Sequence, residues 1–150
     1  MKRLKEIFIS ITAAACLFSC LPVSAADEIA VWIDNALIVS DVSAQIINDR
    51  AMLPFRAIFE ELDADVDWNG EYQIITAVKG TTVLNLRIDK PIMVRINLKT
   101  QKTEQITLAV PPQIVNDRTM VPVRAVAEAL DASVDWEPES RTVKISTQEE

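Results

Sequence analysis

Residues 46–57 read IINDRAMLPFRA, and residues 114–125 read IVNDRTMVPVRA. A shift of 68 positions superimposes the two stretches, and the agreement continues as far as Trp68 and Trp136. From position 46 to position 68, fifteen of twenty-three residues are identical to their counterparts. Self-similarity at a fixed period is the signature of a repeated supersecondary unit. The sequence therefore predicts two copies of one small structural unit.

Each copy combines a turn signal with a short amphipathic helix. The Asn-Asp pair at 48–49 predicts a tight turn, because Asn and Asp tolerate left-handed backbone angles. Pro54 and Pro122 suit the first position of a helix, where a missing N–H costs nothing. Apolar residues then recur at the spacing of one helical face. These residues are Phe55, Ile58, Phe59 and Leu62 in the first copy, and Val123, Val126, Ala127 and Leu130 in the second.

The remainder of the chain predicts β-structure. Val66-Asp67-Trp68 alternates apolar and polar residues, as a strand with one buried face does. Short runs rich in branched residues recur through the rest of the sequence. We therefore expect an α+β fold of two tandem strand-strand-helix-strand repeats, over residues 29–80 and 81–146. Antiparallel sheets are expected, each covered by one short helix.

The first 25 residues have the three zones of a secretory signal peptide. A basic start precedes an apolar stretch, and residues 22–25 offer small side chains for cleavage after Ala25. Two alternatives stay open: an uncleaved membrane anchor, and a lipoprotein acylated at Cys20, where residues 17–20 resemble a bacterial lipobox. The mature domain is expected to span residues 26–150 and to be secreted or held in the cell envelope.

The mature chain is acidic. Removing Lys2, Arg3 and Lys5 leaves 15 − 3 = 12 basic residues, and removing Glu6 leaves 22 − 1 = 21 acidic ones. The net charge of residues 26–150 is then 12 − 21 = −9. Nucleic acid is an unsuitable partner, because its phosphates require a basic footprint. A membrane contact is expected only through a lipidated Cys20 or an uncleaved signal.

The duplicated residues resemble a known family. The stretch at 114–125, with Glu128-Ala129-Leu130 and Val134-Asp135-Trp136 after it, is similar to the copper amine oxidase N-terminal-like domain, also called a stalk domain, of secreted Gram-positive bacterial proteins. The resemblance covers residues 29–146. The chain departs from the family where Asp49, Asp117, Asp63 and Asp131 stand in place of its usual glycines.

The resemblance implies a non-catalytic module. In the oxidases this domain is an appendage, and the copper chemistry elsewhere needs histidine ligands and a tyrosine-derived cofactor. This chain has no histidine and one tyrosine, Tyr72. We expect no catalytic residues, no metal ligands and no cofactor. The candidate residues are those of the structural repeat motif: Asn48, Arg50, Pro54, Arg56, Trp68, Asn116, Arg118, Pro122, Arg124 and Trp136.

Two pairs among these residues have competing interpretations. Arg56 and Arg124 can bind an anionic ligand, but a structural ion pair is favoured, either with the glutamate four residues on or with Asp67 and Asp135, which would hold helix to sheet. Trp68 and Trp136 can stack on sugar rings, but their alternation with valines favours core packing. Trp32 and Tyr72 have no repeat partner and are better candidates for an exposed contact.

The expected function is a non-catalytic, exported cell-envelope module with a structural or adaptor role. Its partner is expected to be an envelope protein or a cell-wall polymer of unknown identity. The alternative is an acidic extracellular protein that binds a small ligand or calcium through Asp63, Asp65, Asp67, Asp131 and Asp135. A hydrolase using the same carboxylates is a third hypothesis.

Overall fold

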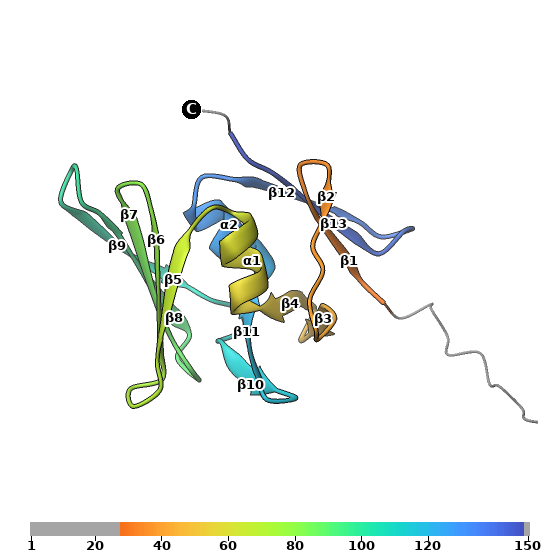
Figure 1. Ribbon diagram of the computed structural model, residues 1–150, viewed down its shortest axis with the longest axis horizontal. Helices are drawn as coiled ribbons and strands as arrows, with labels where there is room; N and C mark the ends of the chain where they lie inside the picture. The colour runs from red at the N-terminus through yellow and green to blue at the C-terminus, as the bar shows by residue number, and fades with distance from the viewer. Residues whose placement is uncertain (1–27, 149–150) are drawn as a thin grey trace, which may run out of the picture.

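The computed structural model describes residues 28–148. The predicted signal peptide, Cys20 and the last two residues lie outside this range. The described chain is mostly β, with thirteen strands in three sheets and two short helices (Figure 1). The elements are β1 (Ala30–Ile33), β2 (Ala36–Leu37), β3 (Gln45–Ile47), β4 (Arg50–Pro54), α1 (Phe55–Glu61), β5 (Asp65–Asn69), β6 (Ile74–Lys79), β7 (Thr82–Arg87), β8 (Ile92–Asn97), β9 (Lys102–Thr107), β10 (Gln113–Val115), β11 (Arg118–Pro122), α2 (Val123–Ala129), β12 (Ser133–Glu137) and β13 (Thr142–Ser146).

The two motif stretches meet in one sheet of order β10-β11-β4-β3. Each begins with a hairpin whose two-residue turn is the predicted Asn-Asp pair. Asn48 and Asn116 have φ values of 47° and 49°, and the aspartates after them have φ values of 61° and 59°. Positive φ at both central residues gives the twist that a hairpin needs. The hairpins join through β4 and β11, where Leu53 lies opposite Val121.

Both helices bury the predicted apolar face. The side chains of Ile58 and Phe59 in α1, and of Val126 and Ala127 in α2, are fully buried. Pro54 and Pro122 lie one position earlier than predicted, because each occupies the N-cap and ends its strand. Each helix is followed by an aspartate in the left-handed region. The φ value is 55° at Asp63 and 64° at Asp131.

The predicted sheet arrangement is wrong in two respects. The sheets do not each belong to one repeat, because β5-β6 opens a five-stranded antiparallel sheet, β5-β6-β7-β8-β9, whereas β12-β13 joins β1 and β2. That second sheet is not purely antiparallel, since β1 runs parallel to β13 with Val31 beside Val143. Strand β1 pairs with β13 at the position where β7 pairs with β6. The equivalent hairpins β5-β6 and β12-β13 therefore have different neighbouring strands.

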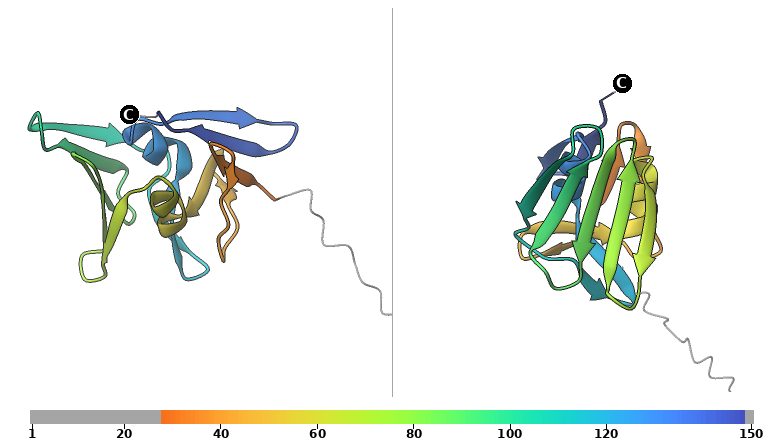
Figure 2. Two further views of the ribbon diagram at one scale, coloured as in Figure 1. Left: turned by 45° about the horizontal axis from the view of Figure 1, so that its top comes forward. Right: turned by 90° about the vertical axis from the view of Figure 1, so that its left-hand side faces the viewer.

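The helices lie between the five-stranded sheet and the β12-β13-β1-β2 sheet (Figures 1 and 2). One main apolar core joins all three layers. It includes Ile75 and Leu84 of the five-stranded sheet, Phe59 of α1, Val126 of α2 and Ile145 of β13. Neither helix within residues 28–148 is long and apolar enough to cross a membrane.

Candidate functional site

A groove of about 1070 Å³ lies on the surface beside α2 and is lined in part by motif residues. Its walls come from β8 and β9 of the five-stranded sheet, from α2, from β12 and β13, and from the β3–β4 hairpin. Four of the ten predicted motif residues line it: Arg50, Pro122, Arg124 and Trp136. The groove thus gathers residues from both motif stretches beside the second helix.

Six predicted motif residues lie outside the groove lining. Asn48 and Asn116 form the hairpin turns, and Pro54 caps α1. Arg118 donates two hydrogen bonds to one carboxylate oxygen of Asp41, and this raises the pKa of Arg118 and lowers that of Asp41. The pair ties β11 to the loop before β3, so its role is structural. The remaining two residues, Arg56 and Trp68, belong to α1 and β5.

The two motif tryptophans have different environments. Trp68 is partly buried against the core and contacts Phe55, with ring centroids 6.1 Å apart and an interplanar angle of 38°. Trp136 is 39% exposed, so its predicted core packing is wrong. The counterpart of Phe55 in the second copy is Val123, which is too small to supply an aromatic contact. The ring of Trp136 therefore remains available at the groove.

The two motif arginines also differ. Arg124 forms the predicted i,i+4 ion pair with Glu128 at 3.5 Å, and it donates a hydrogen bond of 2.9 Å to the carbonyl oxygen of Val134. The link from helix to sheet is made by this hydrogen bond to the backbone and, within residues 28–148, not by the alternative ion pair with Asp135. Arg56 instead places its guanidinium 5.1 Å from the centroid of the Phe55 ring. Among the described residues, Arg56 makes no ion pair with Glu60.

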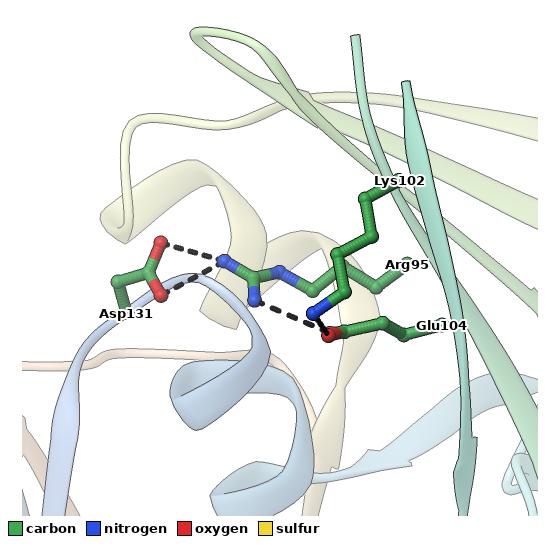
Figure 3. A network of polar contacts seen from close by, with 4 residues as sticks. All are labelled: Arg95, Lys102, Glu104 and Asp131. Carbon is green, nitrogen blue, oxygen red and sulfur yellow. Dashed lines mark hydrogen bonds and ion pairs between the residues drawn. The ribbon is translucent and has the colours of Figure 1, made fainter. Parts of the chain in front are cut away.

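Arg95 fixes the wall of the groove opposite β12. Its guanidinium donates hydrogen bonds of 2.8 Å to both carboxylate oxygens of Asp131, and it lies 3.6 Å from Glu104 (Figure 3). Lys102 lies 2.6 Å from Glu104, and its hydrogen bond is the main cause of the lowered pKa of that carboxyl. The network joins β8 and β9 to the end of α2. It holds the five-stranded sheet against the second helix.

Sequence reasoning missed the groove residues of the five-stranded sheet. Arg95 faces the same side of the sheet as Met93, which is fully buried, because residues two apart in a strand share a face. The signal that could have identified Arg95 is its position two residues after Met93, which places a charged side chain on the core-facing side of β8. Arg141, in the β12–β13 turn, also lines the groove and was not singled out.

The acidic residues of the calcium alternative do not come together. Asp65 and Asp67 alternate with the core-facing Val66 and Trp68 on β5, so they lie on the outer face of the five-stranded sheet. Asp131 pairs with Arg95 on the other side of that sheet. Within residues 28–148, no group of three or more acidic side chains is placed to hold a metal ion. The described residues therefore give the calcium hypothesis no support.

A known protein family matches most of the described chain. The family model described as copper amine oxidase N-terminal domain matches residues 32–148. This chain belongs to the copper amine oxidase N-terminal domain family. The domain is typically a non-catalytic module of bacterial surface proteins, which agrees with the resemblance carried by the motif residues. No curated protein matches the chain in sequence.

Proposed function

We propose that this copper amine oxidase N-terminal domain is an exported, non-catalytic adaptor of the cell envelope that contacts its partner through the groove beside α2. The leader-like sequence at 1–25 supports export. The partner class is an envelope protein or a cell-wall polymer. Of the two motif tryptophans, only Trp136 is in the lining of this groove.

One observation carries this proposal: a groove of about 1070 Å³ is lined by an exposed motif tryptophan. Pockets for small ligands usually have volumes of about 300–1000 Å³, and this groove lies at the upper end of that range. Tryptophan and arginine dominate the binding energy of interfaces where they line a groove. Trp136, Arg50 and Arg124 supply both residue types here.

Sedimentation of the purified domain with cell envelopes isolated from its own host tests this function. We expect Trp136→Ala to weaken binding by at least about tenfold, the loss typical of an interface hot spot. Trp32→Ala is the matched control, because Trp32 is 37% exposed, compared with 39% for Trp136, and lies outside the groove lining. Equal binding by both variants and the wild type contradicts the proposal.

A further inference from the structure

The groove is bordered by two free sheet edges. Strand β9 pairs only with β8, and strand β12 pairs only with β13, among the strands of residues 28–148. Ile106 and Thr107 of β9 and Val134 and Trp136 of β12 line the groove. The two strands lie on either side of α2 (Figure 2, left). Edge strands present unpaired N–H and C=O groups that can pair with another chain.

The backbone of Trp136 faces this free edge. The carbonyl oxygen of Ile145 accepts a 2.7 Å hydrogen bond from the N–H of Asp34 in the β1–β2 turn, so it points away from β12. Val134, opposite Ile145, correspondingly directs its carbonyl to Arg124. Because bonded and non-bonded pairs alternate in an antiparallel ladder, Trp136 has the same orientation as Val134. Its N–H and C=O are therefore available for strand pairing.

The lining of the groove is rich in arginine. It contains four arginines, Arg50, Arg95, Arg124 and Arg141, and two acidic residues, Asp49 and Glu128, whereas Asp131 and Glu104, which hold Arg95, lie outside the lining. Residues 26–150 carry −9 by the count given above. A local concentration of guanidinium groups favours carboxylates, which arginine binds with paired hydrogen bonds.

Arg50 is the arginine best placed to accept a ligand carboxylate. Its side chain makes one hydrogen bond, of 2.9 Å, to the carbonyl oxygen of Asp49, and it forms no ion pair with any residue in the range 28–148. Arg95 is already held by Asp131, and Arg124 by Glu128. A free carboxylate therefore has least competition at Arg50.

The other lining residues are mainly aliphatic. Val110, Val123 and Val143 are buried beneath the groove, and Ile106 is partly buried. Sugar-binding surfaces use polar groups and stacked rings, whereas valine and isoleucine fit aliphatic side chains. Trp136 is the only aromatic residue in the lining. The groove chemistry therefore favours a peptide over a glycan.

We propose that the groove binds an extended acidic peptide segment of a partner protein, which pairs with the free edge of β12. Aliphatic side chains of the peptide lie on the valines, and a carboxylate binds Arg50. Backbone hydrogen bonds supply affinity in such strand addition, and the alternate side chains supply specificity. This inference rests on the proposed adaptor function, and it names the class of partner.

Titration calorimetry with synthetic peptides tests the proposal. The probe is an end-blocked pentapeptide of alternating valine and glutamate, and the matched control replaces glutamate with glutamine. We expect the acidic peptide to bind at least about tenfold more tightly, since its carboxylate meets Arg50. Arg50→Gln should remove this preference, and Trp32→Ala should leave it unchanged. Equal binding of the two peptides, or none at millimolar concentration, overturns the proposal.

N-methylation of the peptide tests the strand pairing itself. A methyl group on an amide that faces β12 removes a hydrogen bond, whereas one on the next residue points away from the edge. We expect binding to fall with a period of two residues. Uniform sensitivity along the peptide, or binding of oligogalacturonate but of no peptide, contradicts strand addition. In either case, loss of envelope binding by Trp136→Ala would still support the adaptor function, so the two proposals fail separately.

Discussion

Phe55 shields Trp68, with the two ring centroids 6.1 Å apart, and this contact is missing at the equivalent positions of the second motif stretch. There Val123 replaces the phenylalanine and Trp136 is 39% exposed. A single difference in side-chain size thus accompanies a partly buried tryptophan in one copy and an exposed tryptophan beside the groove in the other. The motif tryptophan packs against the core at position 68, whereas at position 136 it is exposed and lines the groove.

This asymmetry predicts unequal effects on stability. Trp68→Ala should lower the free energy of unfolding by about 3 kcal/mol, because it removes a core-packed aromatic side chain. Trp136→Ala should cost less than about 1 kcal/mol, as exposed substitutions usually do. Urea denaturation followed by circular dichroism measures both values. Similar losses for the two variants would mean that Trp136 is also part of the core.

The aspartates after the two helices give a second prediction. Asp63 and Asp131 both have positive φ, where a side chain costs about 1 kcal/mol relative to glycine. Asp63 makes no side-chain hydrogen bond or ion pair within the described chain, so Asp63→Gly should stabilise the fold by about that amount. Asp131→Gly should gain less, because it also removes the pair with Arg95.

Thermal denaturation of both glycine variants, repeated with Arg95→Met, measures this difference. Once Arg95 is replaced, Asp131→Gly should stabilise the protein as much as Asp63→Gly does. A difference that persists in the Arg95→Met background would show that the ion pair is not its cause.

The pH dependence of stability follows from lowered carboxyl pKa values. Asp34 accepts hydrogen bonds from the backbone N–H and the hydroxyl of Thr147. Both bonds lower the pKa of Asp34 below the usual 3.8, and the bond from the backbone N–H has the larger effect. Lys144 lowers the pKa of Glu137 in the same way. The unfolded chain then binds more protons in acid, so stability is present above the unfolded pKa and falls as pH falls through the folded value.

Urea denaturation between about pH 3 and pH 7 checks this sign. We expect the midpoint to be constant near neutral pH and to decrease below about pH 4.5, where the unfolded carboxyl groups begin to bind protons. Asp34→Asn should lower the midpoint at pH 7 and make the acid decrease shallower. A midpoint that rises in acid would contradict the assignment.

Local features of the fold were predictable from the sequence. The Asn-Asp turns and the apolar helix faces depend on neighbouring residues, and the structure confirms them. The sheet partners were not predictable, because β1 pairs with β13 more than a hundred residues later in the sequence. The apolar pattern of a strand determines which of its faces is buried, but it does not identify the distant strand with which it pairs.

The sequence did not predict the groove, although it singled out some of the residues that line it. Arg124 and Trp136 were identified from the repeat, but alternation with Val134 suggested a buried tryptophan in both copies. Burial depends on the residue that packs on the ring, and that residue differs between Phe55 and Val123. Arg95 and Arg141 come from segments outside the repeat motif, so no motif pattern linked them to the site.

Site-specific photocrosslinking in the native host tests the central claim most directly. A benzophenone amino acid replaces Ile46, which lines the groove and is 41% exposed, in one variant, and Ile92, which is 43% exposed on the outer face of the five-stranded sheet, in the other. The proposed adaptor function predicts a crosslinked envelope product from position 46 and none from position 92. Crosslinking from position 92 alone would place the contact on the outer sheet face and contradict the role of the groove.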